Sequence, residues 1–217
     1  MGKILKGIVG GVSGTVGPVV GAIVRGIATV RSRPKKSSKP PKQSQILQRS
    51  KFGMALKFIK SVKSVVNIGF QSVKTMNGSN AAMRDLLNNA IIGVAPDYKI
   101  DFPNVTLSKG SLPDAYTMRV MPPLPDLEVV INWNPAELSA DIMLSRGTDR
   151  IVVFMYDEDT RRSLSITGAA ARSAGTYQIS MPVAFEGKTV HVWAFFVSDD
   201  REFSSPSQYL GTIIPIL

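Results

Sequence analysis

Short segments in which apolar and polar residues alternate occupy the second half of the sequence, and this pattern constrains the fold more than any other feature. The segments read AYTMRVM, LEVVINWN, RIVVFMY, RRSLSIT, GTYQISM, TVHVWAFFV and SQYLGTI, with Trp133 on the second and Trp193 on the sixth. Alternation with a period of two is typical of half-buried β-strands, and Pro, Gly and Asp residues separate the segments. Seven short strands in this order predict an antiparallel β-sandwich of the immunoglobulin or fibronectin type over residues 96–217.

Amphipathic helices are predicted before this region, in residues 44–95, so that the fold class is α+β. The apolar stripe of the first helix contains Ile46, Phe52, Ala55, Leu56, Ile59, Val62, Val66 and Phe70, and Asn77 or Asn80 can cap a second helix that runs from about Asn80 to Ile92. We expect the stripe to pack against the second helix or the sandwich. The lysines on the opposite side leave a second interpretation open, in which the helix lies on an anionic membrane.

The charges are divided unevenly along the chain. Residues 1–84 contain sixteen Lys or Arg and no acid, so of the 26 basic and 16 acidic residues in total, ten basic and sixteen acidic ones remain for residues 85–217. The first part is therefore strongly basic and the second is acidic, with a net charge of 10 − 16 = −6. This asymmetry suggests that the basic part meets phosphate, anionic lipid or the acidic part of a second copy.

A glycine-rich apolar tract, Gly7–Val24, opens the chain and has no charged residue. Its length would suffice for a membrane-spanning helix, but six glycines and Pro18 make it a poor helix, and it lacks the continuous apolar core of a signal peptide. Half of residues 7–30 are Val, Ile or Thr, which favours extended strands with glycines at turns, bulges or close backbone approaches. By default we expect the protein in the cytoplasm or within a particle.

A basic segment, RSRPKKSSKPPKQ, joins this tract to the first helix and completes an N-terminal region of residues 1–43. It is predicted to be a linker or an extended arm. Two interpretations of its charges stay open: they are solvated by water, or they neutralise the phosphates of a bound nucleic acid. The candidate anion-binding residues are Arg31, Arg33, Lys35, Lys36, Lys39 and Lys42 in the segment and Lys51, Lys57 and Lys60 on the following helix. No aromatic residue lies within the arm, so any binding of nucleic acid should be independent of base sequence.

Few residues are suited to catalysis or to metal binding. The chain has no cysteine and one histidine, His191, which lies in a strand pattern and is expected either to face outward or to be satisfied by a neighbouring group. Gly11, Gly14 and Gly17 match no phosphate-binding loop, and Asp157-Glu158-Asp159 is interpreted as a hairpin tip rather than a calcium loop. We therefore expect a non-enzymatic protein without catalytic, cofactor-binding or metal-binding residues and without a small-molecule substrate.

Several blocks, in this order, resemble a family of uncharacterised proteins of about this length from Bacteroidota or their phages. The blocks are KILKGIVGGVSGTVG from Lys3, VRGIATVRSRPKKSSKPPKQSQILQRSKF from Val24, NIGFQ from Asn67, APDYKIDF from Ala95, LSKGSLPDA from Leu107 and the final SSPSQYLGTI. The resemblance covers essentially the whole chain and implies an architecture and a prokaryotic or phage origin, but no reaction. One departure is the stretch from Ile23 to Gly26, where the family pattern places an aromatic residue before the basic one.

Two functions follow as hypotheses. In the first, the protein is a structural subunit of a virion-associated particle or filament and self-associates through its N-terminal tract, because an exposed β-prone segment can pair with a neighbouring chain. The candidate partner-pairing residues are Val12, Val16, Val19, Val20, Ile23 and Val24. In the alternative, residues 25–63 bind nucleic acid through its phosphates without sequence preference. The two functions can coexist in one protein.

Overall fold

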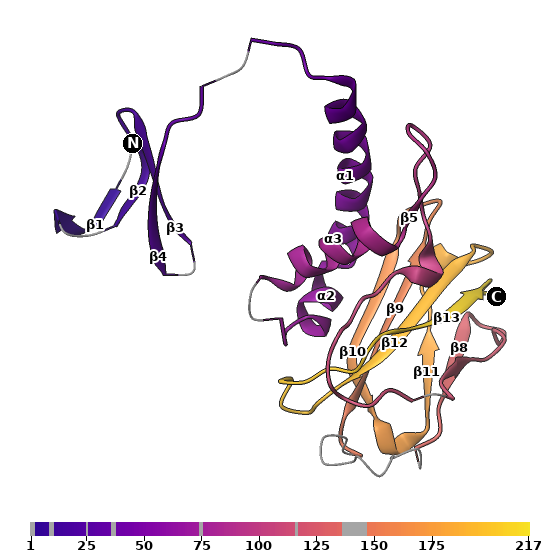
Figure 1. Ribbon diagram of the computed structural model, residues 1–217. Helices are drawn as coiled ribbons and strands as arrows, with labels where there is room; N and C mark the ends of the chain where they lie inside the picture. Colours follow the sequence, from indigo (N-terminus) through magenta and orange to yellow (C-terminus); the bar gives the residue numbers. More distant parts are fainter. Residues whose placement is uncertain are drawn as a thin grey trace. The chain divides into compact units, whose positions relative to one another are not determined.

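The computed structural model describes residues 3–8, 11–24, 26–35, 38–73, 76–115, 117–135 and 147–217, the first of these ranges by its backbone only. The chain divides into two compact units, Met1–Lys42 and Gln43–Leu217 (Figure 1). The sequence analysis placed the end of the N-terminal region at residue 43 and separated the helices from the strands at residue 96. In the structure, the helices and the later strands belong to the same unit.

The first unit is an antiparallel sheet of four consecutive strands: β1 (Lys3–Ile8), β2 (Val12–Val16), β3 (Val19–Val24) and β4 (Ile27–Ser32). Gly17 and Gly26 occupy the turns on either side of β3 with φ of 54° and 79°, a region that L side chains rarely adopt. At Gly21 the backbones of β2 and β3 approach so closely that a Cβ atom would lie 2.1 Å from the Val12 carbonyl oxygen. The prediction of strands with glycines at turns and close approaches is thus confirmed.

Helices α1 (Gln43–Ser61), α2 (Lys63–Gly69) and α3 (Gly78–Asn89) open the second unit. The predicted first helix is interrupted at Val62, whose ψ of 4° departs from helical geometry. Asn77 caps α3, because its side-chain oxygen accepts a hydrogen bond of 2.8 Å from the Asn80 backbone N–H. The predicted extension of α3 to Ile92 is wrong, because Ile91–Ile92 forms strand β5 and pairs with β6 (Lys99–Ile100).

The remaining strands form two antiparallel sheets, and each predicted strand segment coincides with one of them, although β9 (Arg150–Asp157) and β10 (Ser163–Ala171) extend past the ends of their segments. The larger sheet has the order β10-β9-β12-β13 and is built from β9, β10, β12 (Val190–Val197) and β13 (Gln208–Ile213). The smaller sheet has the order β11-β8-β7 and is built from β7 (Arg119–Val120), β8 (Glu128–Asn132) and β11 (Thr176–Ser180). Single-turn 3-10 helices lie at Phe102–Asn104, Arg172–Ala174 and Val183–Phe185.

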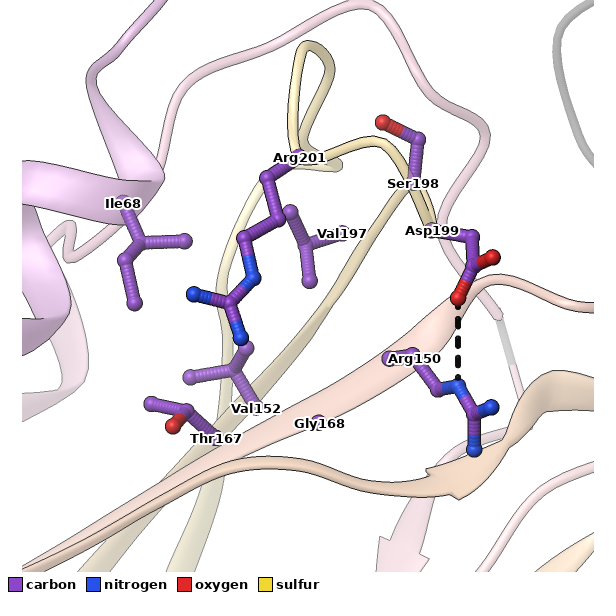
Figure 2. A pocket seen from close by; sticks show the side chains of 9 residues that line it. All are labelled: Ile68, Arg150, Val152, Thr167, Gly168, Val197, Ser198, Asp199 and Arg201. Carbon is purple, nitrogen blue, oxygen red and sulfur yellow. Dashed lines mark hydrogen bonds and ion pairs between the residues drawn. The ribbon is translucent and has the colours of Figure 1, made fainter.

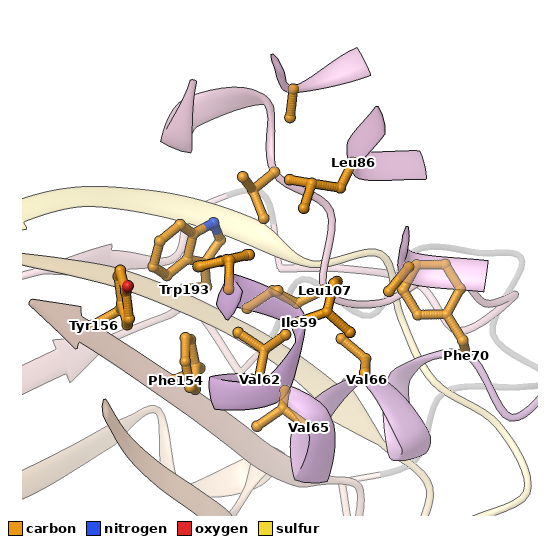
Figure 3. Close-up of a cluster of buried hydrophobic side chains, with 14 of the residues drawn as sticks. Ile59, Val62, Val65, Val66, Phe70, Leu86, Leu107, Phe154, Tyr156 and Trp193 are labelled. Atoms are coloured by element: carbon orange, nitrogen blue, oxygen red, sulfur yellow. The ribbon is translucent and has the colours of Figure 1, made fainter. Parts of the chain in front are cut away.

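Both faces of the larger sheet are covered. One face shares a core with the smaller sheet, in which Ile151 and Phe196 pack with Ile131. The other face packs against the helices, where Phe154 and Trp193 join Val62 and other residues of the helical stripe (Figure 3). The expectation that the stripe packs on the second helix or the β region is confirmed for Ala55, Ile59, Val62, Val66 and Phe70. It is wrong for Ile46, Phe52 and Leu56, which are exposed. Strands β9 and β12 read as nearly continuous apolar runs because both of their faces are buried.

A buried arginine fixes the loop before β7 to the sheets. The Arg172 guanidinium donates hydrogen bonds of 2.7 Å and 2.9 Å to the carbonyl oxygens of Pro113 and Asp114. It also lies 4.6 Å from the centroid of the Phe196 ring, in a cation–π contact. The Trp133 indole N–H donates a hydrogen bond of 2.6 Å to the Arg172 carbonyl oxygen. Core aromatic residues therefore contact both the guanidinium and the backbone of Arg172.

Two phenylalanines on α1 allow the packing of the helices on the sheet to be tested. Phe58 is 2% exposed and lies 5.2 Å from the Tyr156 ring, whereas Phe52 is 45% exposed. We expect Phe58→Ala to lower the free energy of unfolding by about 3–5 kcal/mol, because it removes a buried ring and leaves a cavity. The matched change Phe52→Ala should alter it by less than about 0.5 kcal/mol. Urea unfolding followed by fluorescence measures both, and equal effects of the two changes would contradict this packing.

Candidate functional site

The N-terminal sheet is the first candidate, because its described side chains form no hydrophobic core. Of residues 11–24, 26–35 and 38–42, only Gly21 is buried, and none of these residues belongs to either hydrophobic core. Val16 faces Val19 and Ile23 faces Ala28 across the ladder, so these apolar side chains share one face of the sheet. The described part of the sheet thus contains no buried side chain.

The predicted partner-pairing residues all lie on β2 and β3 but not on one face. Val12, Val16, Val19 and Ile23 alternate onto the first face, whereas Val20 and Val24 lie on the opposite one. Val16, Val19, Ile23 and Val24 are exposed, and Val12 and Val20 are half-buried. The sequence analysis did not include Ile27 and Val30 of β4, which are 68% and 63% exposed. The β-branched run through Val30 was the signal that could have identified them.

The structure distributes the predicted anion-binding residues over both units. Arg31, Arg33, Lys35, Lys39 and Lys42 are exposed on β4 and the segment after it, and Lys36 lies outside the described residues. On α1, Lys57 and Lys60 are exposed.

The remaining member of the set, Lys51, has a local structural partner. Its ammonium donates a hydrogen bond of 3.1 Å to the Leu87 carbonyl oxygen near the end of α3. A cation at the C-terminal end of a helix interacts favourably with the helix dipole. Lys51 therefore stabilises the contact between α1 and α3.

A pocket of about 280 Å³ lies where the larger sheet meets α2 (Figure 2). Val152 and Val197 contribute apolar lining, and Arg150 pairs weakly with Asp199, with 3.5 Å between Nε and Oδ1. Figure 2 shows the Arg201 side chain extending from its turn towards Val152. Guanidinium groups suit carboxylate or phosphate, so the pocket could hold a small anion. The sequence analysis assigned none of these lining residues to a site and missed this pocket.

The single histidine is part of the protein's packing. His191 is half-buried on β12, its Nδ1 lies 2.8 Å from the Tyr209 hydroxyl, and its ring centroid lies 4.0 Å from that of Phe102. Burial lowers the pKa of His191 below its ordinary value of 6.5, and Asp157 opposes this shift. The expectation that a neighbouring group satisfies His191 is confirmed.

The acidic turn between β9 and β10 has a structural role. Glu158 and Asp159 are exposed, but Asp157 is 1% exposed and accepts a 3.0 Å hydrogen bond from the Asp159 backbone N–H. The interpretation as a hairpin tip implied that these acids are exposed to solvent. Asp157 is instead buried, and its hydrogen bond stabilises the turn from within.

Among the residues that the structure describes, no group of three or more acids or histidines could hold a metal ion. Within the same residues, every helix is too short or too polar to span a membrane.

Replacing Gly21 with Val tests the close approach of β2 and β3. The added Cβ would lie 2.1 Å from the Val12 carbonyl oxygen, so we expect Gly21→Val to open the β2–β3 pairing. Ala22→Val, at the next residue of β3, changes the opposite face and should preserve the pairing. Hydrogen exchange of the β3 amides measures the effect, and equal protection in the two variants would show that the backbones do not meet here.

A second prediction concerns pH. Because the pKa of His191 is lowered by folding, the unfolded chain binds the proton more readily between the lowered pKa and 6.5. The free energy of unfolding should therefore fall as the pH decreases through this range, and His191 contributes fully above it. The variant His191→Gln, which cannot titrate there, should show a shallower decrease. Urea unfolding across the range tests this, and identical pH profiles of both proteins would refute it.

Comparisons with known proteins support a family assignment without a reaction. No protein with a curated description matches the chain. Among solved structures, the fn3 domain of human contactin 1 is similar to 51% of this chain and 84% of its own, at 7% identity and a TM-score of 0.32, which is too low to support an argument. Residues 11–211 match the family of unknown function DUF6266. The chain therefore belongs to this family, as the resemblance of its sequence blocks to an uncharacterised family implied.

Proposed function

We propose that this protein is a non-enzymatic structural subunit that assembles with copies of itself, in a filament or a virion-associated particle, through its N-terminal sheet. One observation carries the proposal: the described part of this sheet has no buried side chain. A sheet is stabilised when it buries an apolar face against another surface. Contact with a second molecule would provide such a surface.

The exposed edge of the sheet supports the same proposal. In the order β1-β2-β3-β4, strand β4 is an edge strand, and it is exposed along its whole length. An exposed edge strand offers unpaired backbone groups to a strand from another chain. Backbone hydrogen bonds would then give affinity, and Ile27 and Val30 would contribute apolar contacts on either face.

Charge favours a second copy as the partner. The N-terminal sheet and the segment after it belong to the 84 residues without an acid, whereas residues 85–217 carry a net charge of 10 − 16 = −6. The basic part of one copy is thus complementary to the acidic part of another. Such a head-to-tail contact uses two different surfaces of the same chain and can continue into a ring or a filament.

We also infer that the two sheets of the second unit are a variant of the immunoglobulin or fibronectin sandwich. Strands β7 to β13 would correspond to A, B, C, C′, E, F and G, in chain order. The orders β11-β8-β7 and β10-β9-β12-β13 then read E-B-A and C′-C-F-G, an arrangement in which C and F are neighbours. The helices on the outer face of the C′-C-F-G sheet would be an addition to this architecture.

The alternative function, binding of nucleic acid without sequence preference, is supported by the exposed cations Arg31, Arg33 and Lys35. Cations of this kind bind phosphates by displacing counterions, and such binding weakens steeply with salt. The half-buried position of Lys51 and its bond to Leu87 reduce its contribution to this surface.

Light scattering on the purified full-length protein, with and without nuclease, tests both functions. We expect a defined oligomer that resists nuclease, and we expect Val30→Lys to convert it to monomers because the change places a charge on the apolar face. Thr15→Lys adds the same charge to the opposite face, which carries Arg31 as well as Val20 and Val24, and should impair assembly less than Val30→Lys does.

The outcomes separate the two functions clearly. If Val30→Lys assembles as the wild type does, the apolar face of the sheet is not the contact and the proposal fails. A particle that forms only with nucleic acid and disappears after nuclease treatment or in high salt would instead support the alternative.

A further inference from the structure

A second pocket, of about 220 Å³, lies at the opposite end of β9, between α1, β6 and the β9–β10 turn. Aromatic rings hold Tyr156 in position at its inner side. The Tyr156 ring lies edge-on to Phe58 at 5.2 Å, 5.9 Å from Phe102, and stacked with Phe154 at 6.4 Å. Figure 3 shows Tyr156 beside Phe154 at the margin of the core. Packing of this kind fixes the ring and therefore the position of its hydroxyl group.

The Tyr156 hydroxyl is a polar group available to a ligand. Tyr156 as a whole is only 5% exposed, and its hydroxyl forms no hydrogen bond with any residue that the structure describes, so the hydroxyl is the part of the side chain that reaches solvent. Burial raises the pKa of Tyr156, so the hydroxyl stays protonated and can donate a hydrogen bond at neutral pH. A donor that faces the pocket can exchange its hydrogen bond with water for one with an acceptor of a ligand.

Three cations from separate elements line the same pocket as this hydroxyl. Lys57 comes from α1, Lys99 from β6 and Arg161 from the β9–β10 turn. Glu158 is the only acid among the described residues of the lining, so their net charge is 3 − 1 = +2. Arg161 has a φ of 57°, an unusual conformation for a residue other than glycine. The Asp157 side chain braces the turn by accepting from the Asp159 backbone N–H and the Thr160 hydroxyl, which holds Arg161 in this position.

The remaining lining suits a flat ring. Met54, Tyr98 and Ile100 are half-buried and line the same pocket. Thioether and aromatic side chains make favourable contacts with aromatic ligands. The pocket therefore combines a cationic part with an apolar part.

We propose that this pocket binds a phosphate ester of a flat aromatic group, the chemistry that phenyl phosphate and nucleotides share. Lys57, Lys99 and Arg161 would neutralise the phosphate, the Tyr156 hydroxyl would donate to one of its oxygens, and the ring would contact Tyr98 and Met54. None of these residues belongs to the N-terminal sheet, so this proposal can hold or fail independently of the assembly function.

Isothermal titration of the full-length protein with phenyl phosphate, inorganic phosphate and adenosine monophosphate tests the proposal at constant ionic strength. We expect one saturable site for phenyl phosphate, with an affinity about tenfold or more above that of inorganic phosphate because of ring stacking. Tighter binding of adenosine monophosphate than of phenyl phosphate would identify a nucleotide as the natural form, and the reverse order would indicate a smaller aryl phosphate. Equal affinity for inorganic phosphate and phenyl phosphate, or no saturable binding, would overturn the proposal.

Matched variants separate the site from general electrostatics. Arg161→Gln and Lys57→Gln should each weaken phenyl phosphate binding about tenfold, because each removes a charge-assisted hydrogen bond. Arg162→Gln and Arg84→Gln make the same charge changes at exposed residues outside the lining and should leave binding unchanged. Equal losses in the members of each pair would overturn the assignment. Tyr156→Phe keeps the packed ring and should also weaken binding, which a purely structural role of the hydroxyl would not explain.

Discussion

The pairing of β9 with β12 is the interaction on which the second unit depends. The two strands align over their whole length, from Val190 opposite Asp157 to Val197 opposite Arg150. Alternate residues of each strand enter two different cores, so a shift of one residue would move every side chain to the wrong core. The same register places the two pockets: Arg150 at the start of β9 lines one, and Tyr156 near its end lines the other.

The two units of the chain are stabilised in different ways. In Gln43–Leu217, buried apolar surface on both sides of a sheet provides the main driving force for folding. In the N-terminal sheet, backbone hydrogen bonds and glycine-dependent close approaches hold the strands together. Because hydrogen bonds exchanged with water contribute little net stability, such a sheet gains most from a surface that excludes water from its apolar face.

Much of this architecture could be predicted from local patterns. Alternation located the seven later strands, Asn77 marked the start of α3, and the glycines near β3 indicated its turns. The burial of β9 and β12 on both faces was missed, although their unbroken apolar runs carried that signal. Neither pocket could be found in this way. Lys57, Lys99 and Arg161 are far apart in the sequence, and only the packing of α1 and β6 beside β9 brings them to one cavity.

The segment between β4 and α1 has a geometric consequence for any assembly. Ten residues separate Ser32 from Gln43, and a chain of ten residues spans at most roughly 33–36 Å. A neighbouring molecule that receives the N-terminal sheet must therefore present its binding surface within that radius of the donor's α1. If the N-terminal sheet binds a neighbouring molecule, as proposed, the length of this segment limits the distance between the sheet and the donor's α1. Each added or deleted residue would change that limit by roughly 3.5 Å.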